Sequence, residues 1–315
     1  MSPSIVSIVI PTQRRAESLT RALRSALAQT GVAPARLELV VVDNDAQPTA
    51  RDLVQSFAAA AAFPVRYVHE PRSGVANARN AALSVAAGEF IAFLDDDEEA
   101  STGWLAALLD VQSRCAADVV FGPVRARAPD TVRRHRDYLE QFFSRTDPAE
   151  AGLIDRYYGC GDSLVRRAAL PDQQRPFSVL RNQTGGEDDL LFGRMQDLGA
   201  RFAWAPEAWV WEDPIPDRLN LRYTLRRAFA YGQGASSRCA AAQPPDWPGV
   251  ARWMIIGLGQ VGIYGVAAIF KWLFRAPDRA FAIDRAARGL GKMLWWKPFK
   301  MKFYGLSADG RARPA

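Results

Sequence analysis

The chain has 315 residues, of which 49% are hydrophobic and 23% charged, and this composition excludes a disordered, collagen-like or coiled-coil protein. Three widely spaced cysteines and two histidines exclude a disulfide scaffold and a Cys/His zinc module. The formal net charge of +6 is uneven, because residues 1–220 carry net −6 and residues 221–315 carry net +12. We therefore expect two parts with different tasks, with a boundary near residue 220.

Apolar strands and helical patterns alternate through about the first 95 residues. The expected order is strand 5–10, helix 17–29, strand 37–42, helix 49–62, strand 65–69, helix 75–86 and strand 90–94. This alternation predicts an α/β fold with a doubly wound, mostly parallel sheet flanked by helices. No signal peptide is expected, because the N-terminus has no basic segment and Pro11 interrupts its apolar run.

The pattern is less regular after residue 95. We expect a short helix at 104–109, a strand at 119–124, a charged loop or lid at 127–156, ordered structure at 157–165, a turn and helix at 185–198 and a strand at 202–210. Residues 221–315 are predicted to form a helical, basic and aromatic appendage.

Polar side chains follow three of the predicted strands. They occupy positions 11–12, 43–45 and 95–97. Because ligands of open α/β sheets bind beyond the carboxyl ends of the strands, we expect these groups to line one rim. Asp95 and Asp97 can face the same side of a turn, where their oxygens suit Mg²⁺ or Mn²⁺ and a diphosphate. The alternative is a solvated acidic loop.

Two further segments carry candidate functional groups. Glu187, Asp188 and Asp189 stand at the start of a predicted helix, either as favourable partners of the helix dipole or as a general base for a hydroxyl. Arg72 and Arg79 are placed near the same rim, where they either contact nucleotide phosphates or lie on a helix surface.

Five segments, in this order and at this spacing, resemble family 2 glycosyltransferases of the GT-A fold. They are Ser7-Ile8-Val9-Ile10-Pro11-Thr12, Val41-Val42-Asp43-Asn44, Gly74-Val75-Ala76-Asn77-Ala78-Arg79-Asn80, Phe93-Leu94-Asp95-Asp96-Asp97 and Gly186-Glu187-Asp188-Asp189-Leu190. The resemblance covers residues 4–215 and implies a GT-A domain at 1–220. It also implies an inverting transferase that uses a nucleotide-diphosphate sugar and Mn²⁺ or Mg²⁺.

The resemblance assigns roles on the donor side. Asp95-Asp96-Asp97 matches the D-x-D motif, so that Asp97 would be the metal ligand and Asp95 would lie by the ribose and the metal. Asp43 matches a position that contacts the nucleobase, and the resemblance favours uracil as that base. The neighbouring donor-side positions are Pro11, Thr12, Arg14, Arg79 and Asp96.

On the acceptor side, Asp188 matches the general base of the family, Glu187 would support it, and Asp189 is the competing assignment. The product would be a β-linkage from an α-donor.

Two departures from the family pattern stand out. Trp211-Glu212-Asp213 occupies a place where many relatives have a histidine, which puts a histidine metal ligand in doubt. Gly159-Cys160-Gly161-Asp162 replaces a Gly-x-Gly-Asn motif, so that Asp162 either touches a sugar or caps a turn.

The C-terminal region predicts membrane association. Residues 253–270 carry no charge, and residues 275–302 mix basic with aromatic side chains, which favour the headgroup region. Residues 253–303 would thus either span the membrane once or lie at its surface, on the cytoplasmic face of the inner membrane. A soluble helical cap is the alternative, and no nucleic-acid partner is expected. If the region is membrane-bound, the acceptor would be a saccharide linked to a polyprenyl diphosphate, as in polysaccharide biosynthesis.

Two other functions compete with the transferase. A sugar-1-phosphate nucleotidylyltransferase shares the α/β architecture and carboxylates, but it usually has a glycine-rich loop after the first strand, where this chain has Pro11-Thr12-Gln13-Arg14-Arg15. A catalytically inactive GT-A scaffold has little reason to keep so many acids close together. The donor sugar, the acceptor and the oligomeric state are left open.

Overall fold

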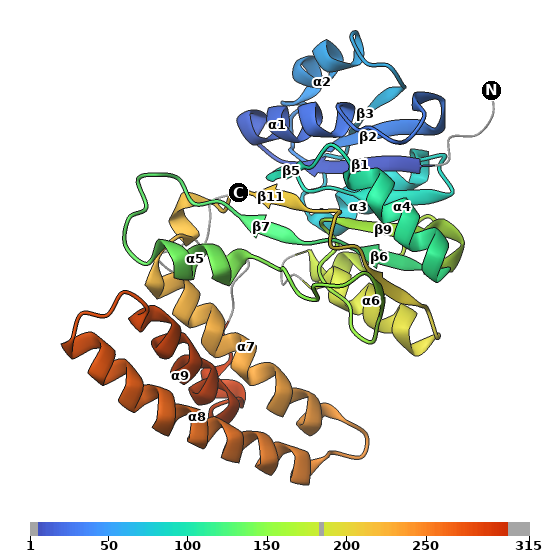
Figure 1. Ribbon diagram of the computed structural model, residues 1–315. Coiled ribbons are helices and arrows are strands. Elements are labelled where there is room, and N and C mark those ends of the chain that lie inside the picture. Colours follow the sequence, from blue (N-terminus) through green and yellow to red (C-terminus); the bar gives the residue numbers. More distant parts are fainter. Residues whose placement is uncertain (1–5, 183–185, 302–315) are drawn as a thin grey trace. The chain divides into compact units, whose positions relative to one another are not determined.

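The computed structural model describes residues 6–182 and 186–301 (Figure 1). The described chain divides into two compact units. One consists of the chain up to Arg127 together with Ser144–Asp213, and the other of Ala128–Phe143 together with the chain from Pro214.

The first unit is a mixed α/β structure. Its strands are β1 (Val6–Thr12), β2 (Leu37–Asp43), β3 (Val65–His69), β4 (Phe90–Phe93), β5 (Glu98–Ala100), β6 (Val119–Phe121), β7 (Val124–Ala126), β8 (Gly152–Ile154), β9 (Ser163–Arg166), β10 (Phe202–Trp204) and β11 (Val210–Glu212). Its helices are α1 (Ala16–Leu27), α2 (Arg51–Ala58), α3 (Val75–Val85), α4 (Trp104–Cys115) and α6 (Glu187–Asp197), with 3-10 turns at Pro34–Arg36, Arg167–Ala169 and Val179–Arg181.

The central sheet has the strand order β3-β2-β1-β4-β9-β6-β10-β8. Strands β3, β2, β1 and β4 are parallel to one another, whereas β9 runs antiparallel to both of its neighbours. Strands β5, β11 and β7 form a smaller sheet. The predicted α/β class with a mostly parallel sheet is therefore confirmed.

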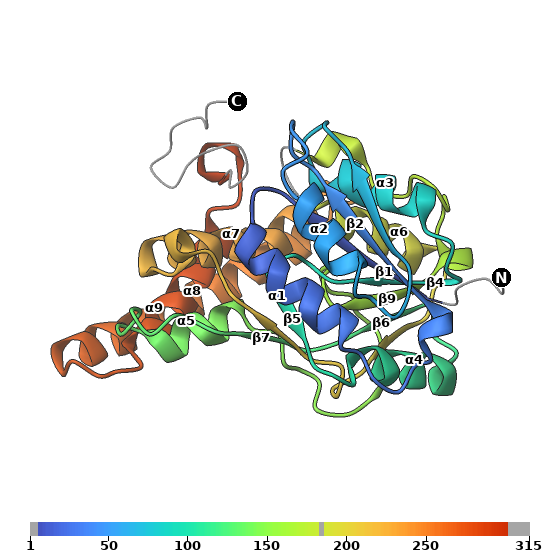
Figure 2. The same ribbon diagram turned by 90° about the horizontal axis from the view of Figure 1, so that it is seen from above.

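Helices cover both faces of the sheet, which explains why β1 and β2 are apolar throughout rather than alternating. Ile8 and Leu39 pack on the side of α1, α2 and α4. Val9 and Val40 pack on the side of α3 and α6. Figure 2 shows the two layers of helices with the sheet between them.

The structure differs from the sequence prediction in three segments. The predicted strand 119–124 is two strands, since β6 ends at Phe121 and β7 begins at Val124 in the smaller sheet. The segment 127–156 is not an irregular loop throughout, because it contains α5 (Arg136–Phe143), whose Tyr138 and Leu139 are buried. The predicted strand 202–210 is two strands, since β10 ends at Trp204 and β11 begins at Val210 in the other sheet. The predicted positions Ile5 and Gly185 lie outside the described residues.

The second unit is helical, as expected for the C-terminal region. Besides α5 it contains α7 (Leu221–Ala241), α8 (Trp247–Leu273) and α9 (Arg279–Met293), with 3-10 turns at Pro216–Arg218 and Lys297–Phe299. Asp246 begins α8, where its side chain accepts a hydrogen bond from the amide of Gly249 at 2.8 Å. The hydroxyl of Tyr138 donates to Asp284 of α9 at 3.1 Å.

Candidate active site

The carboxyl ends of three parallel strands meet at one rim, as the sequence predicted. Thr12 of β1 is in register with Asp43 of β2. The Thr12 hydroxyl donates to Oδ2 of Asp96, just beyond β4, at 2.7 Å. The turn that follows β4 is therefore fixed against the end of β1, and it begins the run of five acids at 95–99.

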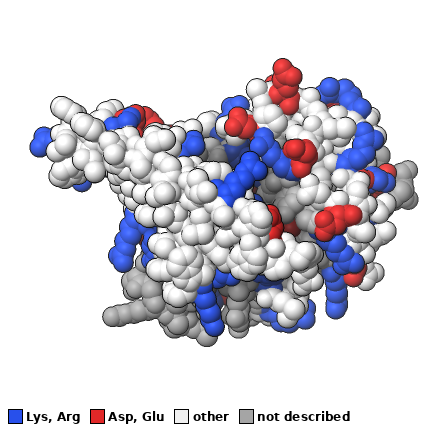
Figure 3. Space-filling view, turned by 90° about the horizontal axis from the view of Figure 1, so that it is seen from below, with Lys and Arg blue, Asp and Glu red and all other residues white. Residues whose placement is uncertain are grey.

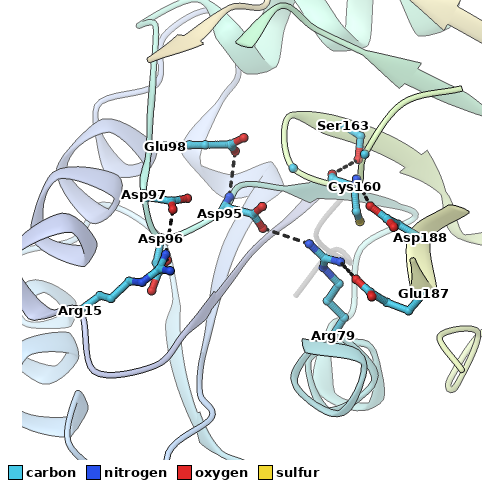
Figure 4. A network of polar contacts seen from close by, with 12 residues as sticks. Arg15, Arg79, Asp95, Asp96, Asp97, Glu98, Cys160, Ser163, Glu187 and Asp188 are labelled. Carbon is cyan, nitrogen blue, oxygen red and sulfur yellow. Dashed lines mark hydrogen bonds and ion pairs between the residues drawn. The ribbon is translucent and has the colours of Figure 1, made fainter. Parts of the chain in front are cut away.

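Arg15 is paired with two of these acids. Its Nη1 lies 2.8 Å from Oδ1 of Asp96 and 2.8 Å from Oδ2 of Asp97 (Figure 4). Burial raises the pKa of Asp97 to about 6, and repulsion from Asp95 and Asp96 adds to the effect of burial. One arginine does not compensate the negative charge of this turn.

Arg79 of α3 joins the two acidic motifs. Its Nη2 lies 3.1 Å from Oδ1 of Asp95, and its Nη1 lies 2.7 Å from Oε1 of Glu187 at the start of α6. The side chains of Arg79 and Glu187 are 5% and 6% exposed, so that this pair is out of solvent. Figure 4 shows the guanidinium between the two carboxylates. A residue predicted as a donor contact thus holds Asp95 and Glu187 together.

Asp188 faces the loop Gly159–Asp162. Its Oδ2 accepts a hydrogen bond from the amide of Cys160 at 3.2 Å, and its Oδ1 accepts one from the amide of Asp189 at 2.9 Å. Asp188 is half-buried, whereas Asp189 is exposed. Gly161 of the loop has no room for a side chain, because a Cβ there would lie 2.7 Å from Oδ2 of Asp95. Asp188 and the turn after β4 therefore line the same site.

The remaining predicted donor-side residues lie at the ends of β1 and β2. Asp43 is buried and accepts hydrogen bonds from the amide of Ala50 at 2.7 Å and from the hydroxyl of Tyr67 at 2.9 Å. Arg14 pairs through Nε with Asp45 at 2.7 Å, and Pro11 is half-buried. Asp43 thus shapes the loop after β2, and its contact with a nucleobase stays a prediction.

The carboxylate oxygens of Asp95 and Asp97 are suitable ligands for a divalent cation such as Mg²⁺ or Mn²⁺. Within residues 6–182 and 186–301, no group of three or more His, Cys, Asp or Glu side chains is arranged to hold a metal ion. Mg²⁺ commonly binds through one or two carboxylates, with water and substrate phosphates as its other ligands. Among the five consecutive acids at 95–99, Arg15 pairs with Asp96 and Asp97, Arg79 pairs with Asp95, and Arg127 pairs with Glu99. The carboxyl groups therefore outnumber the arginines that contact them.

The segment 211–213 occupies the place where many relatives have a histidine, and it makes ion pairs. Asp213 contacts Arg21 and Arg127, both at 2.8 Å, and its amide donates to the carbonyl of Asp97 at 3.1 Å. The guanidinium of Arg127 also lies 5.6 Å from the ring centre of Trp211. This segment therefore supports the backbone of the acidic turn.

Sequence reasoning missed Arg145, which organises the loop opposite Asp188. Its guanidinium donates to the carbonyls of Gly122 at 3.0 and 3.1 Å, of Gly161 at 3.1 Å and of Gly159 at 3.4 Å. It also packs on Tyr158, 5.1 Å from the ring centre. Its position in a charged segment gave no sign of these partners, because all of them are distant in sequence.

Replacing Arg145 with lysine should lower kcat by about 10–100-fold with little change in the donor KM, because lysine cannot reach several carbonyls at once and the loop beside Asp188 would shift. Steady-state kinetics checks this. Arg156→Lys is a matched control, since Arg156 also packs on Tyr158, at 5.6 Å. A kcat for Arg145→Lys equal to that of the control would disprove the assignment.

Asp162 is a structural carboxylate with an unusual environment. It is fully buried at φ +52°, and its Oδ1 accepts a hydrogen bond from Nε1 of Trp104 at 2.7 Å. Its Oδ2 has no hydrogen-bond partner among the described residues, and Nη2 of Arg145 is 3.9 Å away. Burial raises the pKa of Asp162 to about 7.

We expect the free energy of unfolding to be pH-dependent through Asp162. Between pH 4 and 7 the folded chain keeps a proton that the unfolded chain has released, so that stability falls as pH rises. Asp162→Asn keeps the bond to Trp104 and suits the left-handed backbone. It should be more stable than the wild type at pH 8 by up to about 4 kcal/mol, with the difference vanishing near pH 4. Urea unfolding across pH measures this, and an equal slope in both proteins would refute it.

The chain was compared with known proteins. A model described as "Glycosyl transferase family 2" matches residues 7–172, which is more than half of the sequence. The chain belongs to glycosyl transferase family 2. The family and the enzyme class expected from the sequence are thereby confirmed, and the family match decides against a nucleotidylyltransferase.

Two curated relatives extend this result. The chain is 40% identical over 230 residues to the succinoglycan biosynthesis protein ExoM of Rhizobium meliloti (strain 1021), covering 72% of this chain and 73% of the relative. It is 35% identical over 112 residues to WfgD of Escherichia coli, named a UDP-Glc:alpha-D-GlcNAc-diphosphoundecaprenol beta-1,3-glucosyltransferase. That match covers 36% of this chain and 41% of WfgD.

A solved structure confirms the fold. The mannosyltransferase PcManGT from Pyrobaculum calidifontis, in complex with GDP-Man and Mn²⁺, superposes with a TM-score of 0.60 at 19% identity. The match covers 94% of this chain and 88% of that one. Together with the strand order, this confirms the expected GT-A fold.

Proposed function

We propose that this family 2 transferase is inverting and metal-dependent. It moves a sugar from a UDP-sugar to a hydroxyl of a polyprenyl-diphosphate-linked saccharide in polysaccharide biosynthesis. The observation that carries the proposal is the contact of Arg79 with both Asp95 and Glu187, because it brings the acids expected at the donor next to those expected at the acceptor. An active site for sugar transfer needs both groups in one place.

The relatives support the finer parts of the proposal. ExoM is named for the biosynthesis of a polysaccharide, and WfgD for a UDP-linked donor and a diphosphoundecaprenol-linked acceptor. PcManGT was solved as a complex with Mn²⁺. These properties belong to those proteins, and we extend them to this chain on the basis of the shared family.

Asp188 is the proposed general base. Its half-buried carboxylate takes the proton of the acceptor hydroxyl while that oxygen bonds to the anomeric carbon. Attack comes from the face opposite the diphosphate, whose bond to the sugar breaks, and the nucleoside diphosphate leaves. An α-donor thus gives a β-linkage. Glu187, held by Arg79, fixes the first turn of α6 and with it Asp188.

The donor binds at the rim of β1, β2 and β4. Asp95 and Asp97 are the residues that would hold Mn²⁺ or Mg²⁺, which when bound neutralises the charge that develops on the diphosphate. Asp96 orders this turn through Arg15 and Thr12. Pro11, Arg14 and Asp43 are proposed to form the nucleoside side of the site.

The proposed organisation places the transferase at residues 1–220 and a membrane-associating region at residues 221–315. Within the described part of the chain, α8 is a helix long and apolar enough to cross a membrane, and 6% of its most apolar stretch is buried. Attachment through residues 253–303 on the cytoplasmic face of the cell membrane would bring the site to a lipid-linked acceptor. Phe303 lies outside the described residues.

A panel of nucleotide sugars tests the proposal. The chain is incubated with each donor and a membrane lipid extract, with Mn²⁺, with Mg²⁺ or with EDTA, and the released nucleoside diphosphate is measured. We expect release from one UDP-sugar, abolished by EDTA and lowered at least about 100-fold by Asp97→Asn. Asp110→Asn, at an exposed aspartate, is the control. Equal release with EDTA and with metal would contradict metal dependence.

A further inference from the structure

One side of α8 exposes a row of apolar side chains. Ile255, Leu258, Ile263, Val266 and Ile269 have exposed fractions between 55% and 70%. Their spacing of three to five residues places them along one side of the helix. Figure 3 shows a broad surface without charged residues over the C-terminal helices. A contiguous apolar surface of this kind marks an interaction site.

The length of α8 is sufficient to span a bilayer. The helix has 27 residues, which corresponds to about 40 Å, and its most apolar stretch has a mean hydropathy of 1.7. Length and hydropathy therefore do not distinguish a spanning helix from one that lies on the membrane. The packing of the neighbouring helices does.

The other side of α8 is packed closely against α9. A Cβ on Gly257 would lie 2.6 Å from the carbonyl oxygen of Gly289, and a Cβ on Gly289 would lie 2.7 Å from that of Gly257. Nζ of Lys292 also contacts Oε1 of Gln260 at 3.0 Å. An α8 that spans the membrane would therefore have to take α9 into the bilayer or break this packing.

Helix α9 is unsuited to the hydrocarbon core. It carries Arg285, Arg288 and Lys292, and of these Arg288 is paired with Asp284 at 2.7 Å. It is also bound to α7, where the hydroxyl of Ser236 donates to the carbonyl of Lys292 at 2.8 Å. Charged side chains are expensive in hydrocarbon, so that a spanning α8 would have to abandon its packing against α9.

We infer that α8 lies flat in the surface of an anionic bilayer, with the row from Ile255 to Ile269 facing the acyl chains. This rests on the proposed function, in which the acceptor is lipid-linked. The exposed Arg252, in the second turn of α8, and Arg275, just after its last residue, lie near the two ends of the helix, where they meet anionic headgroups. Lys271 is already paired with Asp278. This charge arrangement favours a lipid surface over a protein partner.

Co-sedimentation of the full chain with vesicles of phosphatidylcholine and phosphatidylglycerol tests the attachment. We expect binding that weakens in pure phosphatidylcholine or at high salt, and that falls at least about tenfold in Ile263→Asp. Leu198→Asp is the matched control, because Leu198 and Ile263 are both 69% exposed. Equal binding of the two variants, or self-association of the wild type through this row without vesicle binding, would overturn the inference.

A second measurement separates flat from spanning attachment. A cysteine added at Gln243 or at Pro277, exposed positions on either side of α8, is labelled with a membrane-impermeant maleimide on vesicle-bound protein, and the wild type with its three native cysteines gives the background. A flat helix leaves both sites reactive from outside, whereas protection of one site would show that α8 spans. Transfer by Ile263→Asp to a detergent-solubilised acceptor should match the wild type. If neither the wild type nor Ile263→Asp transfers sugar to the solubilised acceptor, the result counts against the proposed function instead.

Discussion

Replacing Asp188 with asparagine should lower kcat about 10²–10⁴-fold, the usual contribution of a general base, while the donor KM changes little. The asparagine side chain keeps the shape of the carboxylate, and its oxygen can still accept the hydrogen bond from the backbone amide of Cys160. In the wild type this amide lies 3.2 Å from Oδ2 of Asp188. What it loses is the ability to take the proton of the acceptor hydroxyl. Rates of sugar transfer and donor binding by calorimetry, measured on the same preparation, check the prediction.

Asp189→Asn is the matched control for this test. Asp189 is the neighbouring carboxylate in the same helical turn, but it is exposed, and we expect its loss to leave kcat within about threefold of the wild type. The reverse result, with Asp189→Asn inactive and Asp188→Asn active, would assign the base to Asp189. If both variants are active, neither Asp188 nor Asp189 is the general base.

Replacing Arg79 with methionine should destabilise the fold by about 3–5 kcal/mol, because the Glu187 carboxylate would be left buried without a partner. Arg79 is fully enclosed and contacts carboxylates on two sides, with its guanidinium also 5.6 Å from the ring centre of Phe177. Urea unfolding monitored by tryptophan fluorescence measures the change.

The double variant Arg79→Met, Glu187→Met gives the decisive comparison. Removing both partners should cost less than removing Arg79 alone, since no unpaired charge then remains at Glu187. Arg72→Met is the control, because the Arg72–Glu70 pair has the same 2.7 Å distance but a 73% exposed arginine, and it should change the stability little. An Arg79→Met variant as stable as Arg72→Met would show that the buried pair does not hold the motifs together.

Much of the donor side could be predicted from the sequence. Strands β1, β2 and β4 are short apolar runs that end in polar groups, and parallel strands place such endings on one rim. The two acidic motifs were located for the same reason, since each lies at the end of a strand or the start of a helix. Local periodicity is sufficient for features of this kind.

Contacts between distant side chains could not be predicted in the same way. Arg15 is one of two adjacent arginines, and the sequence does not tell that Arg15 faces Asp97 while Arg14 faces Asp45. The partners of Arg145 are carbonyl groups, which leave no trace in residue type. Helix α5 could not be predicted because it lies in a highly charged segment. Its buried residues Tyr138 and Leu139 pack in a core with residues that are distant in sequence.

The configuration of the transferred sugar is the direct test of inverting transfer at this site. The purified chain is given the UDP-sugar identified by the donor panel, a divalent metal and a polyprenyl-diphosphate-linked saccharide, and the new linkage is analysed by NMR. We expect one β-linked sugar for each nucleoside diphosphate released, and none with Asp188→Asn. An α-linked product, or nucleoside diphosphate released with only free sugar formed, would contradict inverting transfer by this site.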